Sequence, residues 1–190
     1  MTAGELIAEL ARDEEFQAQQ TKRDVEQEER YRGLRVAEAL IVADLRGAGV
    51  DVASAWDLVN TNEPYPLALP VLVEHLERGG YPDRVMEGLG RALAVKPAVA
   101  YWDRLKACYL LARGPEETGG IAVALAACAT SRQIDDLIDL IGENENGSSR
   151  VFLIRPTLKV GGERGRQRVE ALRDDAVLGR EATALLNGRG

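Results

Sequence analysis

The chain has 190 residues, of which 45% are hydrophobic, 29% are charged and only 5% are aromatic. This composition supplies enough apolar side chains for a core, which argues against wholesale disorder. The net charge of −7 argues against general binding to nucleic acid, which requires a dense positive surface.

The first part of the chain, residues 1–63, is expected to form a charged helical arm followed by docking helices. Residues 13–32 contain helix formers throughout but few large apolar residues, so they lack the stripe that docks a helix on a core. We therefore expect an exposed helix there. A short apolar stripe precedes it, formed by Leu6, Ile7 and Leu10.

A helix that docks on the core is predicted next. Its apolar residues recur at intervals of three and four, and they are Leu34, Ala37, Ile41 and Leu45. A short helix is expected at 52–59. The turn at 60–66 contains Pro64 and Pro66, each of which disfavours helix in the residue before it, so it marks a boundary at 63/64.

From residue 66 onward, apolar helical stripes alternate with glycine and proline. The first stripe ends at Gly79-Gly80, and Pro82 suits the first turn of the helix that follows. The clearest stripe consists of Ile134, Leu137, Ile138 and Ile141. This spacing predicts that these four side chains face the core and that the aspartates between them face water.

Three segments each join an apolar helix to a second helix through a polar turn. They read LVEHLERGGYPDRVMEGLGRAL, LIDLIGENENGSSRVFLIRPTL and RVEALRDDAVLGREATALL, and Arg84, Arg150 and Arg180 fall early in the second helix of each. The pattern resembles HEAT or armadillo-type helical repeats, above all small bacterial HEAT-like proteins of undefined function. The resemblance implies an all-α fold, a short right-handed α-solenoid of about four helical hairpins at 64–190.

One pair departs from the repeat pattern. Glu116-Glu117 stands where the Asp/Arg turn signature is expected, which leaves the register of that pair open. An irregular helical bundle is the structural alternative.

No catalytic, cofactor or metal site is expected. Asp135, Asp136 and Asp139 spell DDxxD, a Mg²⁺-diphosphate motif in isoprenoid synthases, but they lie on an ordinary amphipathic helix. His75 is the only histidine; it is expected to be partly exposed, and it lacks a zinc-binding or hydrolase pattern. The glycine-rich segment at 161–166 has no P-loop ending.

Several features predict the cellular setting. The longest uncharged apolar run, 121–129, is too short to cross a membrane. The N-terminal ten residues contain two glutamates and no basic residue, unlike a signal peptide. Cys108 and Cys128 lie in apolar helical segments, as core cysteines do in a reducing compartment. We therefore expect a cytoplasmic protein.

The function predicted from this pattern is non-enzymatic binding of another protein through the concave surface of the solenoid. Candidate contact residues are two tyrosines in turns and five arginines in second helices: Tyr65, Tyr81, Arg84, Arg91, Arg150, Arg155 and Arg180. Trp102 is expected in the core. Two alternatives stay open: an immunity-type inhibitor of a basic toxin or nuclease, and a HEAT-like DNA glycosylase, which would need a basic concave face carrying aromatic side chains.

Overall fold

The computed structural model describes residues 2–4, 14–142 and 144–188, and all regular secondary structure within them is helical, as the sequence predicted. The predicted stripe of Leu6, Ile7 and Leu10 lies outside the described residues. The chain divides into two compact units, residues 1–37 and 38–190. In the described part, no helix combines the length and the apolar character that crossing a membrane requires.

Helix α2, Glu14–Gly47, supplies most of the first unit. Residues 17–33 are all exposed, including the apolar side chains of Val25 and Tyr31. An ion pair within this unit joins Arg35 Nη2 to Glu28 Oε1 at 2.7 Å. This stretch is an exposed helix with charged residues on all sides.

The second unit begins at residue 38, within α2, so residues 38–63 belong to the same unit as the helices that follow. Here α2 buries Ile41 and Leu45 completely. The helix ends at Gly47, and the short helix α3, Trp56–Val59, follows.

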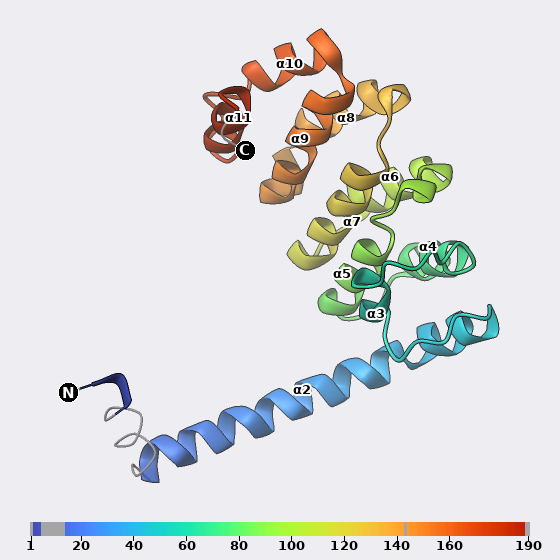
Figure 1. Ribbon diagram of the computed structural model, residues 1–190, viewed down its shortest axis with the longest axis vertical. Helices are drawn as coiled ribbons and strands as arrows, with labels where there is room; N and C mark the ends of the chain where they lie inside the picture. Colours follow the sequence, from blue (N-terminus) through green and yellow to red (C-terminus); the bar gives the residue numbers. More distant parts are fainter. Residues whose placement is uncertain (1, 5–13, 143, 189–190) are drawn as a thin grey trace. The chain divides into compact units, whose positions relative to one another are not determined.

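Four successive pairs of helices make up the rest of the chain (Figure 1). The first helices of the pairs are α4 (Ala68–Arg78), α6 (Trp102–Leu111), α8 (Ile134–Gly142) and α10 (Gly162–Glu170). The second helices are α5 (Asp83–Ala92), α7 (Pro115–Cys128), α9 (Val151–Val160) and α11 (Gly179–Leu186). Short 3₁₀ segments precede α6, α8 and α9: Lys96–Tyr101, Ser131–Gln133 and Asn144–Arg150.

The helices of the pairs form two layers. In the second-helix layer, α3 packs on α5, α5 on α7, α7 on α9, and α9 on α11 (Figure 1). In the first-helix layer, α4 packs on α6 and α8 on α10. The two helices of each pair also contact one another, and the core lies between the layers.

Two glycines bring α5 and α7 into close contact. A Cβ placed on Gly90 of α5 would lie 2.5 Å from the carbonyl carbon of Gly120, and a Cβ on Gly120 of α7 would lie 2.6 Å from the carbonyl oxygen of Glu87. Real Cβ atoms do not approach backbone this closely. The absence of side chains at both positions therefore sets the separation of the two helices.

The buried face of helix α8 differs from the predicted one. Leu137 and Ile141 are completely buried as expected, but Ile134 and Ile138 are only half-buried, and Leu140 joins the core instead. Asp136 is half-buried, not fully exposed to water. The apolar face of α8 is therefore rotated toward Leu140 relative to the predicted stripe.

Candidate functional site

His75 is buried, with only 1% of its surface exposed, which contradicts the predicted partial exposure. Its Nε2 lies 2.9 Å from Asp44 Oδ2 on α2, and its Nδ1 lies 2.6 Å from the Tyr81 hydroxyl in the α4–α5 turn. The order carboxylate, imidazole, hydroxyl is that of a hydrolase triad, with a phenol in place of the serine. Because these bonds join the end of α2, α4 and the α4–α5 turn, we assign them to holding these elements together.

Three cations of the first-helix layer are paired with carboxylates of the neighbouring first helix. Arg104 of α6 donates two hydrogen bonds of 2.6 Å to Glu77 of α4. Lys106 of α6 lies 2.7 Å from Asp136 Oδ1 of α8. Arg164 of α10 lies 2.5 Å from Asp135 Oδ1 of α8. We call these three contacts the ion-pair ladder; each joins residues of consecutive first helices.

The ladder accounts for two of the three carboxylates in the DDxxD motif. Asp136 also accepts a 2.6 Å hydrogen bond from Trp102 Nε1, and Trp102 is buried as predicted. Burial by itself would raise the pKa of Asp136, but hydrogen bonds from Lys106 and Trp102 outweigh it and lower that pKa. Across the described residues, no group of histidines, cysteines or carboxylates is placed to hold a metal ion.

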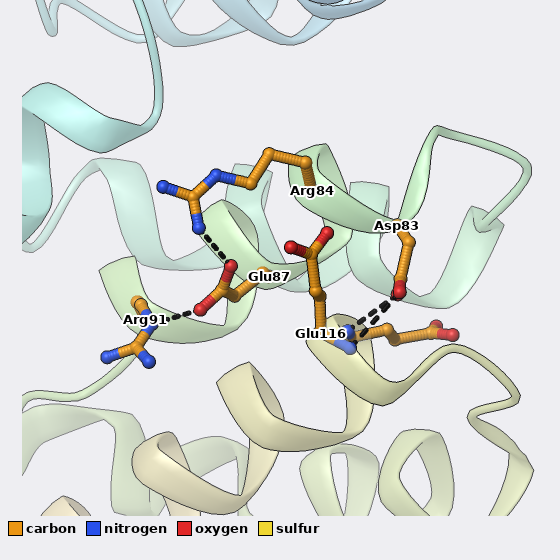
Figure 2. Close-up of polar contacts among 6 residues, drawn as sticks. Asp83, Arg84, Glu87, Arg91 and Glu116 are labelled. Atoms are coloured by element: carbon orange, nitrogen blue, oxygen red, sulfur yellow. Dashed lines mark hydrogen bonds and ion pairs between the residues drawn. The ribbon is translucent and has the colours of Figure 1, made fainter.

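Two of the five candidate arginines neutralise a buried carboxylate. Arg84 and Arg91 both contact Glu87 on α5, and the Arg91 Nε to Glu87 Oε1 distance is 2.7 Å (Figure 2). The Arg84 guanidinium also lies 4.0 Å from the centre of the Trp56 ring. These contacts stabilise α5 and α3, so both cations already have partners within the chain.

Asp83 joins adjacent second helices. Its carboxylate accepts hydrogen bonds from the backbone N–H of Glu117, at 2.7 Å, and of Glu116, at 3.1 Å (Figure 2). These N–H groups belong to the first turn of α7, where a helix has no internal partners for them. Asp83 of one pair therefore caps the second helix of the next pair, and Glu116-Glu117, the predicted departure from the repeat, supplies the capped N–H groups.

The remaining candidates differ in exposure. Arg150, predicted in a second helix, ends the 3₁₀ segment before α9; it is 3% exposed and donates a 2.9 Å hydrogen bond to the carbonyl of Ile141. Tyr65 is half-buried, and its hydroxyl donates a 2.9 Å hydrogen bond to the carbonyl of Ala92. Arg155 and Arg180 are exposed, and neither forms an ion pair within the described part of the chain.

Arg155 lies in a groove between α7 and α9 with a volume of about 630 Å³. We call it the α7–α9 groove. Its lining is mostly apolar and includes Val123 and Ala127 of α7 and Phe152 of α9, whose side chain is 40% exposed. Its charged lining residues are Lys96, Arg155, Lys159 and Glu181.

A second cavity of about 640 Å³ is also lined by Lys96. It is lined by the turn at Pro64 and Tyr65, by Leu69, and by Val95 after α5. Lys96 is the one described residue common to the linings of both cavities. Tyr65 therefore takes part in packing and also lines a cavity, whereas Tyr81 hydrogen-bonds to His75.

The three cations of the α7–α9 groove form no ion pair with any described residue, in contrast to the ion-pair ladder. Sequence reasoning found Arg155 but missed Lys96, Phe152 and Lys159. Phe152, Arg155 and Lys159 have spacings of three and four, which place them on one face of α9. An aromatic residue and two basic residues on one predicted helix face are the sequence feature that could have identified this part of the groove.

The cysteines offer no reactive thiol. Cys128 is buried and Cys108 half-buried, and both are free. Burial raises the pKa of each thiol to about 11, so both stay protonated near neutral pH.

No protein-family model, curated protein or solved structure matches the chain significantly.

Proposed function

We propose that the chain is a non-enzymatic protein-binding module, a short right-handed solenoid of HEAT-like helical pairs that binds another protein through the α7–α9 groove. The ordered packing of α5, α7, α9 and α11 supports the repeat architecture. So does Asp83, whose bonds span 33 and 34 residues to the equivalent helix of the next pair. Such stacked pairs offer an extended surface lined by one helix of each pair.

We choose this groove as the binding surface because its cations form no ion pairs with described residues. In the first-helix layer, the cations of the ion-pair ladder are bound to carboxylates, whereas Lys96, Arg155 and Lys159 surround an apolar groove without ion pairs in the described residues. Phenylalanine and arginine are both enriched at protein interfaces. Phe152 with Arg155 provides this combination.

Neither alternative function has equal support. An inhibitor that neutralises a basic partner would use an acidic surface such as the N-terminal arm, which the net charge of −7 permits, but the groove carries three cations against Glu181. A DNA glycosylase would use a basic face with an aromatic side chain, which the groove has, but its lining is mostly apolar and the chain carries a net charge of −7.

The test is affinity capture from extracts of the source cells, with the protein and two charge-reversal variants as baits. Arg155→Glu with Lys159→Glu removes two groove cations. Arg132→Glu with Arg173→Glu removes two exposed cations outside the groove and lowers the net charge equally. We expect one discrete set of partner proteins that the groove variant loses and the control variant keeps. Equal capture by all three baits would contradict the proposal.

A further inference from the structure

The lining of the α7–α9 groove is mostly apolar, and its charged residues are mostly basic. Val123 and Ala127 of α7 and Pro156 of α9 form part of the apolar lining, and the Phe152 ring adds exposed aromatic surface. Burial of such surface against a partner is favourable, at about 25 cal/mol per Å². An occupant of this groove therefore needs at least one apolar side chain.

The charged residues of the lining favour carboxylates. Arg155 and Lys159 lie one helical turn apart on α9, and Lys96 lies before α6. None of these three forms an ion pair within the described chain, and Glu181 is the one acidic residue of the lining. Arginine binds a carboxylate through two parallel hydrogen bonds, which lysine does not match. Charge complementarity thus favours an occupant with acidic groups beside its apolar residue.

The dimensions favour a short segment of chain over a broad surface. A groove of about 630 Å³ falls within the range of roughly 300–1,000 Å³ of pockets that enclose small ligands, so it has room for only a few side chains. Lys96 also lines the second cavity, together with Tyr65 and Leu69.

From these observations we infer that the α7–α9 groove binds a linear acidic segment of the partner protein, with an apolar side chain against Phe152 and carboxylates at Arg155, Lys159 and Lys96. This inference rests on the proposed function and names the partner's chemistry. A nucleic acid would also supply negative charge, but the mostly apolar lining offers little to a phosphate backbone.

The experiment pans a phage-displayed library of random linear peptides on the full chain and measures the enriched peptides by fluorescence anisotropy. We expect them to share an aromatic or large aliphatic residue with Asp or Glu three or four positions away. The Arg155→Glu, Lys159→Glu variant should bind them roughly tenfold or more weakly, since two charge-assisted contacts are lost. The Arg132→Glu, Arg173→Glu variant should bind like the original protein.

A charge-swapped peptide provides the sharpest comparison. Replacing its acidic residues by lysine should abolish binding to the original protein and restore binding to the Arg155→Glu, Lys159→Glu variant. Enriched peptides without acidic residues, or affinities that the groove variant leaves unchanged, would overturn the inference. A single-stranded oligonucleotide that displaces these peptides and binds more tightly would also overturn it.

The two proposals can fail separately. If panning enriches no peptide while affinity capture still finds partners lost by the groove variant, the binding module stands and the linear acidic segment is wrong. If capture finds no such partners, the proposed function itself fails.

Discussion

At the residue scale, α8 shows why a periodic stripe alone does not decide which side chains are buried. Ile138 fits the spacing of its apolar neighbours, yet it is half-buried, whereas Leu140 is 2% exposed. The sequence predicts the helix correctly, because its period is local. The rotation of that helix depends on α9 and α10, which pack on it and which local periodicity does not include.

Truncating Leu137 and Ile138 should therefore have unequal effects. Leu137→Ala removes a completely buried side chain and should lower the free energy of unfolding by about 2–5 kcal/mol. Ile138→Ala should cost clearly less because water already reaches part of that side chain. Chemical denaturation of both variants measures the difference, and equal losses would contradict the described faces of α8.

The burial of His75 could not be predicted from the sequence either. Sequence position places it on an amphipathic helix, which predicts partial exposure, but its partners Asp44 and Tyr81 come from 31 residues before and 6 residues after it. A buried histidine needs hydrogen-bond partners for its ring nitrogens. Those partners come together only in the folded chain, where Asp44 at the end of α2 contacts His75 of α4, so the sequence pattern does not reveal them.

At the element scale, the contact between α5 and α7 depends on glycine. Gly120→Ala should destabilise the protein by roughly 1–3 kcal/mol, because the added Cβ would lie 2.6 Å from the Glu87 carbonyl oxygen and would force the helices apart. Gly119→Ala is the matched control, since its nearest atom, in the flexible Phe152 ring, is 3.9 Å away. It should be neutral or stabilising by up to ~1 kcal/mol.

Thermal or denaturant unfolding of these two glycine variants distinguishes close packing from a general helix effect. If Gly119→Ala lowered the free energy of unfolding as much as Gly120→Ala does, α5 and α7 would not approach each other as described.

Helix α2 should differ along its length in amide exchange. Residues 17–33 are all exposed, and most helix stability in proteins comes from packing of an apolar face. Their amides should therefore exchange with solvent much faster than those of α5, where residues 85–90 are all buried. Hydrogen-exchange mass spectrometry tests this, and equal protection of the two segments in the isolated protein would refute it.

The helices and their turns could be predicted because their signals are local. Apolar periodicity, the Gly79-Gly80 pair with positive φ angles at both residues, and prolines at helix starts all act within a few residues. The ion-pair ladder could not be predicted, since its partners lie 27 to 30 residues apart. Many pairings at such separations are compatible with the same charges.

At the scale of the whole molecule, the ion-pair ladder should make stability depend on pH. The pKa values of Glu77 and Asp136 are lowered in the folded protein, Glu77 chiefly by its hydrogen bond with Arg104. A carboxyl group with a lowered folded pKa stabilises the fold above its unfolded pKa and loses this contribution as pH falls through the folded value. We expect the stabilisation to be complete near neutrality and to decline below pH values of about 4.

The variant Asp136→Asn isolates one contribution to this dependence. At neutral pH its free energy of unfolding should be about 1–2 kcal/mol lower than that of the original protein, because Trp102 and Lys106 then lack a charged acceptor. At a pH low enough to protonate Asp136 in the original protein, the difference should shrink toward zero. A difference in unfolding free energy that stays constant with pH would show that the charge of Asp136 does not stabilise the fold.

We propose that the binding surface is the α7–α9 groove and not the first-helix layer. A photo-reactive phenylalanine analogue placed at residue 152 in the groove, or at residue 111 at the end of α6, tests it in the source cells. Leu111 is 70% exposed and Phe152 only 40%, so exposure alone would favour cross-linking from residue 111. We predict discrete protein adducts from residue 152 and none from residue 111. Adducts from residue 111 that equal or exceed those from residue 152 would contradict the claim.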